Sequence, residues 1–487
     1  MNPFTPLLTA TRDLSSAASA AYSGAVAAHF RLAVPVDRRA RLASGWLLLG
    51  VGALIASGVF SLMLVVSRTP GINRLIPVAD LFHVALVVHV DLSVLVWFAA
   101  FGGMLWTLAG SRSAILIGWL GLGLCTAGTL LIALSPFLGT GTPIMANYIP
   151  VLDGPVFLWG LAVFGAGLAV EVLRGLITSQ ATARVLDGPA SLRLGLVAAG
   201  VSTAVALFAF LWSWLALPAS LAGKAYYELL FWGGGHVLQF SWTLLMLVAW
   251  LWLADASGAR VPLSPRVALL LFGLALVLVF ATPFVYLAYD VTSVEHRRLL
   301  TWMMRAGGGL AILPVSLAVV LALLNPGQVR AEQRPLRAAL IMSLTLFAVG
   351  GLIGFAIRGA DVRIPAHYHG CIVGITLAFM GLAYHLLPRL GFCAPRPRLA
   401  SLQAYTYGIG QLLHITGLVW SGGYGVQRKV AGAAQVLGSI QEVAGMALMG
   451  LGGLVAIVGG LLFVVVVMRA LSPERARAAA PVAEARR

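Results

Sequence analysis

Twelve separate runs of apolar residues, each long enough to cross a lipid bilayer, constrain this chain more than any other feature. A transmembrane helix needs about 20 apolar residues to span ~30 Å of hydrocarbon. The runs lie at approximately 46–66, 81–108, 113–136, 151–173, 193–217, 228–254, 267–289, 299–324, 336–358, 367–388, 402–424 and 443–468. Only 10% of the 487 residues are charged, which excludes an ordinary soluble domain. The sequence therefore predicts an all-α polytopic membrane protein with twelve transmembrane helices.

Arginines at the two ends of the chain predict that both termini are cytoplasmic, because Lys and Arg in short flanking segments stay on that side. These arginines are Arg38, Arg39 and Arg41 before the first run, and Arg469, Arg475, Arg477, Arg486 and Arg487 after the last. The chain then divides into a cytoplasmic tail at 1–45, a twelve-helix domain at 46–469 and a basic tail at 470–487. A cleavable signal peptide has a basic start followed by an apolar core. Residues 1–30 lack this pattern, so we expect no cleavable signal peptide.

The net charge of +16 is explained by basic loops that face anionic lipid. The sequence lacks a basic stripe interleaved with aromatic residues, so we do not expect nucleic acid as a partner. Four basic residues nevertheless fall on the outer side under this topology: Arg297, Arg298, Arg428 and Lys429. We expect anionic edges of cofactors to account for them.

Four histidines lie at one depth near the outer ends of three predicted helices: His89, His236, His367 and His369. Successive helical residues are rotated by about 100°, so the pair in His367-Tyr-His369 points toward opposite faces. Imidazoles inside a bilayer are costly unless metals or hydrogen bonds satisfy them. One helix could thus present a histidine to each of two haems.

The remaining histidines and the cysteines carry weaker signals. His83, His385 and His414 are interpreted as packing or hydrogen-bonded residues, while His29 and His296 fall outside the predicted spans. The three cysteines, at 125, 371 and 393, form neither a haem-attachment motif nor a paired-cysteine copper motif. Electrons would therefore come from a partner.

Taken together, the twelve spans, a histidine in helix two, another in helix six and His-x-His at helix ten resemble the catalytic subunit of the haem-copper oxidase superfamily. The resemblance covers most of the chain after residue 45. It implies that His89 and His369 are axial ligands of a low-spin haem, and that His367 is the axial ligand of a high-spin haem. It further implies that His236 binds a non-haem metal, and that Arg428 and Lys429 hold haem propionates.

The chain departs from this family around the non-haem metal. Helix seven ends in Tyr289-Asp290, where the family has two adjacent histidines. Asp290 is the predicted replacement ligand, giving a harder site that suits iron although copper stays open; the alternative is a solvated helix terminus. Glu295 and His296 are possible ligands from the next loop, although an ordinary exposed loop is favoured.

The second departure lies one turn after His236, where many oxygen-reducing relatives have tyrosine and typical nitric oxide reductases have glutamate. This chain has Phe240, so Tyr286 or Tyr289 would have to substitute as redox donor. Carboxylates in or beside the spans lie nearer the outer side, which favours a non-pumping enzyme that draws protons from outside. They are Asp91, Asp153, Glu228 and Asp290.

The leading interpretation is a divergent nitric oxide reductase in a bacterial inner membrane, with its active site toward the outer face. Its catalytic residues would be His236, Asp290 and Tyr289, and its cofactors two haems, most simply b-type, and one non-haem iron or copper. The resemblance implies a cytochrome c or cupredoxin-type electron donor. Two alternatives are an oxygen-reducing terminal oxidase and a haem electron-transfer or gas-sensing protein without the second metal.

Overall fold

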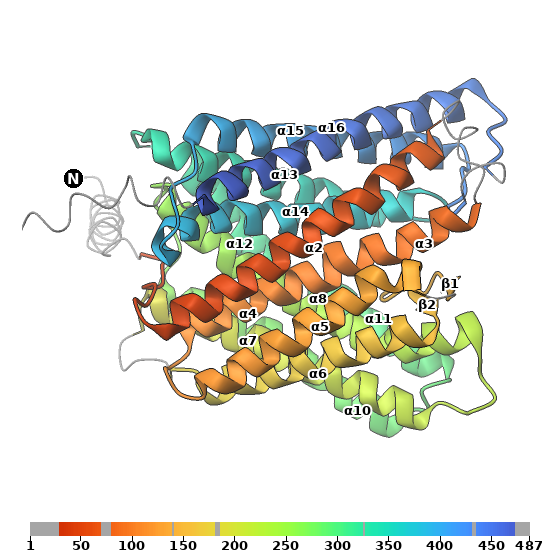
Figure 1. Cartoon of the computed structure of the whole chain (residues 1–487), viewed down its shortest axis with the longest axis horizontal. Coiled ribbons are helices and arrows are strands. Elements are labelled where there is room, and N and C mark those ends of the chain that lie inside the picture. The colour runs from red at the N-terminus through yellow and green to blue at the C-terminus, as the bar shows by residue number, and fades with distance from the viewer. Residues whose placement is uncertain are drawn as a thin grey trace, which may run out of the picture.

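Helices arranged side by side along one direction make up nearly the whole molecule, as a computed structural model of the chain shows (Figure 1). The structure describes residues 29–69, 79–138, 141–180, 186–324, 327–430 and 435–472. The unbroken helices are α2 (Arg38–Arg68), α5 (Ile115–Leu138), α6 (Pro155–Ile177), α7 (Gly188–Ala216), α8 (Gly223–Ala256), α13 (Arg334–Phe355), α14 (Arg363–Leu386), α15 (Pro397–Gly423) and α16 (Ile440–Leu471).

Three further spans are built from consecutive helical pieces. The first is α3 (Ala79–Val90), the π-helix η2 (Asp91–Val96) and α4 (Trp97–Ala109). The second is α9 (Pro265–Val277), the 3-10 turn η3 (Leu278–Phe280) and α10 (Ala281–Ala288). The third is α11 (Val294–Gly307) followed by α12 (Gly309–Leu324), and short 3-10 turns η4 (Ala331–Gln333) and η5 (Leu387–Leu390) flank α13 and α14.

These twelve helical spans match the twelve predicted apolar runs, and the all-α membrane fold is confirmed. Within the described residues, eleven of them are long and apolar enough to cross a membrane. The twelfth is α15, which has 27 residues but contains Gln403, Gln411 and His414. Helix α15 packs closely along α16, so its polar side chains lie partly among neighbouring helices.

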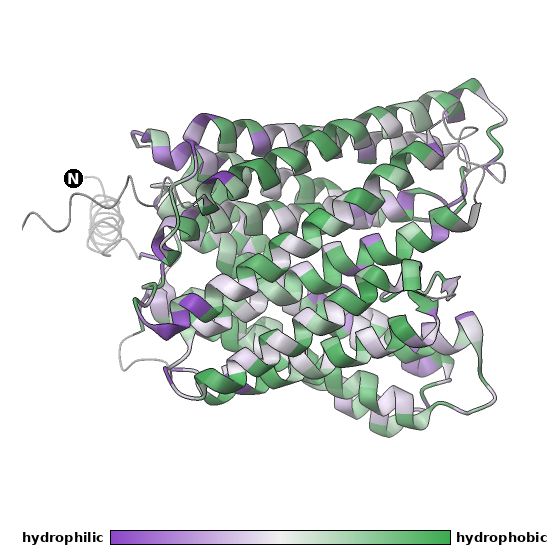
Figure 2. Ribbon diagram, in the orientation of Figure 1, coloured by the Kyte–Doolittle hydropathy of each residue, from purple (hydrophilic) through white to green (hydrophobic). Residues whose placement is uncertain are grey.

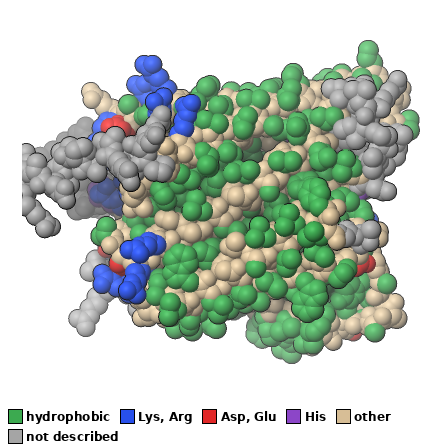
Figure 3. Space-filling view, in the orientation of Figure 1, with side chains coloured by type: hydrophobic (Ala, Val, Ile, Leu, Met, Phe, Trp, Pro, Cys, Tyr) green, Lys and Arg blue, Asp and Glu red, His purple; other side chains and the backbone are tan. Residues whose placement is uncertain are grey.

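The hydropathy of the residues changes along the helices from the middle to the ends (Figure 2). Apolar residues dominate the middle of the bundle, and hydrophilic residues concentrate at its two ends. In the face drawn in Figure 3, Lys and Arg gather at the end where α2 begins. That pattern is the one expected of a membrane protein whose basic end faces the cytoplasm.

Helix α2 begins at Arg38, earlier than the predicted tail boundary at residue 45. Asp37 is its N-cap and accepts a hydrogen bond from the backbone N–H of Arg39. Phe30 is fully buried, so the chain already packs against the bundle ahead of α2. The rest of the predicted N-terminal tail, residues 1–28, and most of the C-terminal tail, residues 473–487, lie outside the described residues.

A small antiparallel hairpin stands at the opposite end of the molecule from the start of α2 (Figure 1). Its strands are β1 (Thr142–Ile144) and β2 (Val151–Asp153), with Pro143 paired to Leu152. The sequence interpretation began a span at residue 151, whereas α6 begins only at Pro155. The hairpin holds the intervening loop, residues 145–150, over the ends of the helices.

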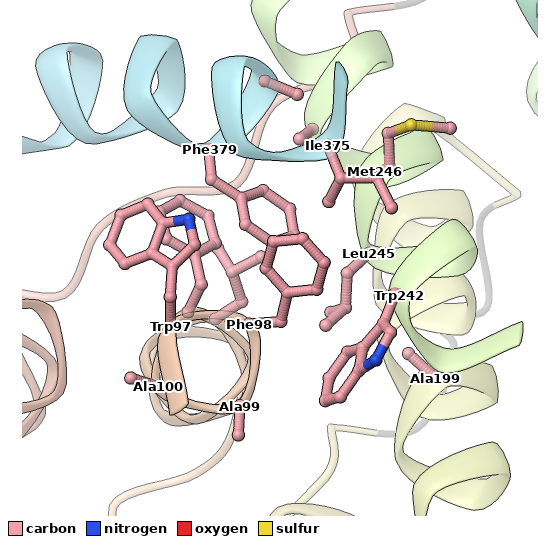
Figure 4. Close-up of a cluster of buried hydrophobic side chains, with 14 of the residues drawn as sticks. Trp97, Phe98, Ala99, Ala100, Ala199, Trp242, Leu245, Met246, Ile375 and Phe379 are labelled. Carbon is pink, nitrogen blue, oxygen red and sulfur yellow. The ribbon is translucent and has the colours of Figure 1, made fainter. Parts of the chain in front are cut away.

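Aromatic side chains fill the core between α4, α8 and α14 (Figure 4). Phe101 stacks on Phe379 with ring centroids 4.2 Å apart, and Phe98 contacts Trp242 edge to face at 5.6 Å. Such pairs stabilise beyond their buried area. They fix α14, which carries His367 and His369, between the helices that carry His89 and His236.

Candidate functional site

Four buried or half-buried histidines share one hydrogen-bond pattern. In each, Nδ1 lies within hydrogen-bond distance of a backbone carbonyl oxygen: Ser57 for His89 (3.1 Å), Trp232 for His236 (2.7 Å), Gly350 for His367 (2.7 Å) and Met449 for His414 (3.0 Å). A carbonyl oxygen only accepts, so Nδ1 must carry the proton. Nε2 then keeps its lone pair, which is the arrangement that a metal-binding histidine requires.

His367 and His369 contact different helices, in agreement with the rotation argument. His367 lies against α13, where it donates to Gly350, and a side chain at Gly354 would meet its ring at 2.9 Å. The ring of His369 lies 5.0 Å from that of His414 on α15. The two faces of α14 therefore present one imidazole each to separate environments.

His89 and His414 both interact electrostatically with His369. His89 is the penultimate residue of α3, directly before the π-helix η2, and the hydroxyl of Ser57 lies 2.9 Å from its Nδ1. π-helical turns are frequent at functional sites. The structure thus brings the predicted pair of low-spin ligands into one region, and adds His414, which had been interpreted as a packing residue.

Basic residues cover this region at the end of the bundle opposite the start of α2 (Figure 1). Lys429 donates from Nζ to the Met145 carbonyl (2.5 Å), and burial lowers the pKa of its ammonium group to about 8. Arg428 is half-buried and interacts electrostatically with Tyr368, between the two histidines of α14. Arg68, at the end of α2, interacts with both Tyr368 and His369. Sequence reasoning missed Arg68 because it ends a helix predicted to stop at residue 66.

Three consecutive glycines make room around His236, which is 1% exposed. A side chain at Gly233 would overlap Tyr286, one at Gly234 would overlap Phe210, and one at Gly235 would overlap Tyr148. The motif Trp232-Gly-Gly-Gly therefore lets α10, α7 and the hairpin loop approach the turn that precedes His236. It is the local reason why two tyrosines stand close to this histidine.

Tyr148 contacts the other ring nitrogen of His236: its Oη lies 2.9 Å from Nε2, and the ring centroids are 4.8 Å apart. The neighbouring Asn147 donates to the Glu228 carboxylate (2.9 Å) and lies 3.4 Å from Nζ of Lys429. Burial, and secondarily the charge of Glu228, raises the pKa of Tyr148. Sequence reasoning missed Tyr148 because it lies on a loop without a motif.

His296 is fully buried, although it follows the exposed Glu295 in the first turn of α11. Neither of its ring nitrogens has a hydrogen-bond partner within the described part of the chain. Its ring packs edge-on against Tyr286 at 4.6 Å, and it interacts electrostatically with His236. The expectation of an exposed loop here was wrong, since α10 and α8 cover the imidazole.

Asp290 and Tyr289, the predicted ligand and redox donor, lie at the surface instead. Asp290 is exposed and accepts hydrogen bonds from Thr292 through its backbone N–H (2.7 Å) and hydroxyl (2.5 Å). These bonds lower the pKa of the carboxyl group. Tyr289 is the C-cap of α10 and is 40% exposed. The structure does not bring either residue to His236, because the chain turns outward at the end of α10.

Phe240 is buried one turn below His236 and would contact any side chain placed at Gly307. The position that carries tyrosine in many oxygen-reducing relatives is therefore an apolar packing site. Tyr286 is the buried tyrosine of helix seven, and its hydroxyl lies 2.9 Å from that of Ser213.

The histidine pattern fits haem ligation, because a buried imidazole with a fixed Nδ1–H and a free Nε2 is what an axial ligand offers. The fit to a non-haem metal is less complete. Within the described residues, no three His, Cys, Asp or Glu side chains are grouped as a metal site. His236 is buried, and its Nε2 is the nitrogen left for a metal, although Oη of Tyr148 lies 2.9 Å from that nitrogen and would have to be displaced.

Comparison with known proteins agrees with this architecture. The family model described as cytochrome c and quinol oxidase polypeptide I matches residues 41–472. An uncharacterized protein of Rickettsia prowazekii (strain Madrid E) is 31% identical over 496 residues, covering 87% of this chain and 94% of the relative. An uncharacterized protein of Aquifex aeolicus (strain VF5) is 29% identical over 351 residues, covering 71% of this chain and 85% of the relative.

Proposed function

The chain belongs to the cytochrome c and quinol oxidase polypeptide I family, and we propose that its own reaction is the reduction of nitric oxide to nitrous oxide. Members of this haem-copper oxidase family are respiratory oxidoreductases of the membrane. The proposed reaction is 2 NO + 2 e⁻ + 2 H⁺ → N₂O + H₂O. We place the protein in a bacterial inner membrane with both termini cytoplasmic.

The proposal rests on the arrangement of three histidines: Nδ1 of His89 and of His367 is bound to a backbone carbonyl oxygen, and the ring of His369 lies beside His414. We assign His89 and His369 to a low-spin haem that accepts electrons, and His367 to a high-spin haem on the opposite face of α14. The two haems, most simply b-type, and one non-haem iron or copper would supply the redox chemistry and the gas-binding positions. Arg68, Arg428 and Lys429 would neutralise propionates above the low-spin site.

Phe240 is the observation that favours nitric oxide over oxygen. Splitting the O–O bond calls for an extra electron and proton close to the metal, which a tyrosine one turn after the helix-six histidine supplies in many relatives. Phenylalanine cannot supply either, and its ring leaves no space for a side chain at Gly307. Joining two NO molecules breaks no O–O bond and would not call for such a donor.

Protons would reach the site from the outer side along the hairpin. Glu228 holds the exposed Asn147, and the next residue, Tyr148, places its hydroxyl 2.9 Å from Nε2 of His236. The Glu228 carboxyl group and the Tyr148 hydroxyl can each take up or release a proton, while the Asn147 amide would orient neighbouring groups through hydrogen bonds. The family implies a cytochrome c or cupredoxin-bearing donor, which would dock at the same outer end.

The test is turnover of the purified, full-length protein with a reduced artificial donor, comparing NO with O₂. We expect NO consumption with formation of N₂O, and slow or absent O₂ consumption. Rapid O₂ reduction together with indifference to NO would contradict the proposal. Iron and copper should be measured on the same sample, because haem iron alone would favour an electron-transfer or gas-sensing protein.

A second candidate is oxygen reduction, and the two tyrosines near His236 favour it. Tyr148 contacts His236 directly, and Tyr286 packs on His296. Either could act as the redox donor that Phe240 cannot be. If the enzyme reduces oxygen, Tyr148→Phe and Tyr286→Phe should separate the two donors, since only the variant that lacks the donor would lose O₂ turnover.

A further inference from the structure

The imidazole of His296 is a buried polar group of the described residues that the histidine assignments above leave unused. It lies in the first turn of α11, whose N-cap Ser293 accepts a hydrogen bond from the backbone N–H of His296 (3.2 Å). Its side chain is 0% exposed, and both Nδ1 and Nε2 lack partners among the described residues. Leaving a buried polar group unsatisfied costs about 1–3 kcal/mol, so such a group indicates a missing partner.

A single tryptophan ties this turn to His236. The Trp232 carbonyl lies 2.7 Å from Nδ1 of His236, while Nε1 of the same Trp232 donates to the Arg297 carbonyl (3.1 Å). Arg297 directly follows His296. The side chain and the backbone of Trp232 therefore connect the segment that carries His236 with the segment that carries His296. The two imidazoles also interact electrostatically.

Tyr286 limits where the imidazole of His296 can go. Its ring stands edge-on to His296 at 4.6 Å, and it occupies the space that Gly233 leaves open on α8. His296 is thus held on the side of α10 that faces α8. Tyr286 belongs to helix seven, on which the resemblance to the family leads us to expect the two histidines that this chain lacks.

We propose that His296 is the second protein ligand of the non-haem metal, together with His236, and that it takes the role of the absent helix-seven histidines. This assignment rests on the proposed function, since it presumes that the second metal is present. Two imidazoles leave positions open for water or a diatomic substrate, as catalytic metal sites require. Asp290 then interacts with His296 from the surface and is not a ligand.

The experiment uses the full-length protein purified with its haems. Haem content and total iron and copper are measured for the wild type, His296→Ala, Asp290→Asn and, as a histidine control distant from α11, His385→Ala. We expect about one non-haem metal per chain in the wild type. His296→Ala should lower metal affinity about tenfold or more with both haems kept, while the other two variants should retain the metal.

Retention of the metal by His296→Ala, or its loss from Asp290→Asn alone, would overturn the assignment. A wild type without non-haem metal would overturn it as well. If His296→Ala also loses haem, a cryo-EM structure of the loaded wild type decides: density joining both imidazoles is expected, and density that avoids His296 refutes the proposal. A wild type that holds the metal through both histidines yet ignores NO would contradict the proposed function and leave this assignment intact.

Discussion

At the scale of single residues, the hydrogen bond at Nδ1 fixes the tautomer of a histidine inside the bundle. It shows which ring nitrogen keeps a lone pair, but it does not by itself separate ligands from packing residues. A backbone carbonyl at Nδ1 forces the free lone pair onto Nε2, and this holds for His89, His236, His367 and His414. His369 differs in that its ring lies 5.0 Å from the ring of His414. Two neighbouring imidazoles, one from α14 and one from α15, therefore lie together in this region.

Replacing His369 by alanine is expected to abolish the low-spin haem spectrum, because the iron loses an axial ligand. His414→Ala should keep that spectrum and shift only the haem potential, since we assign His414 as a neighbour of the ligand. Optical and EPR spectra of the purified variants check this. Loss of the low-spin signal in His414→Ala with its retention in His369→Ala would reverse the two assignments.

The charge on Lys429 predicts a pH dependence of the low-spin haem. Its pKa in the folded chain is about 8, below the ordinary 10.5 because burial disfavours the charged form, so the folded protein loses this charge at lower pH than the unfolded chain does. The free energy of unfolding therefore rises with pH between the folded and the unfolded pKa of Lys429. Over the same range the electrostatic attraction between Lys429 and an anionic propionate weakens.

We expect the potential of the low-spin haem to fall as pH rises through about 8 and above, by an amount equivalent to on the order of 1 kcal/mol. Redox titration at several pH values measures this change. Arginine stays charged at these pH values, so the potential of Lys429→Arg should not fall as pH rises through about 8. The same fall in both proteins would show that another group causes it.

At the scale of secondary-structure elements, glycines set the distances between helices at the candidate site. Helices α15 and α16 approach so closely that a side chain at Gly452 would overlap the backbone of His414, and one at Gly459 would overlap Tyr407. Small residues of this kind allow dense packing within membranes, where no hydrophobic force joins helices. The position of His414 beside His369 is thus determined by glycines on a third helix.

Gly234→Ala should destabilise the bundle, because the added methyl group would overlap both the ring of Phe210 and the carbonyl of Ala206. Overpacking of this kind costs about 1–3 kcal/mol. Thermal unfolding in detergent, followed by haem release, measures the loss. Gly273→Ala on α9 is the matched control, since nothing lies within 4 Å of its added carbon. Equal melting temperatures for the two variants would argue against a packing role for Gly234.

At the scale of the whole molecule, a group of polar and charged side chains lies at the end opposite the start of α2. Glu228, Asn147 and Lys429 form hydrogen-bonded contacts there, beside the hairpin loop. Within α6, Glu171 is buried and paired with Arg174 at 2.9 Å. Its carboxylate is held by this ion pair, which suits a structural role better than proton transfer from the cytoplasm.

Turnover in sealed proteoliposomes should therefore neither pump protons nor build a membrane potential, because electrons and protons enter from the same side. A pH-sensitive dye outside the vesicles should report net alkalinisation without an ionophore present. Glu228→Gln should slow turnover severalfold if this carboxylate lies on the route. Acidification of the outside, abolished by a protonophore, would demonstrate pumping and refute this expectation.

The sequence alone determined the membrane fold and the opposed directions of His367 and His369 on one helix, because apolar length and the 100° helical rotation are local properties. It could not decide which polar residue after helix seven is buried. Asp290 follows helix seven directly in sequence, yet its carboxylate closes a surface turn with Thr292. His296, in the next helix, is buried because Tyr286, Trp232 and the glycines before His236 bring α10, α8 and α11 together. Only tertiary packing decides which of two neighbouring polar residues is removed from solvent, since that depends on contacts between helices distant in the chain.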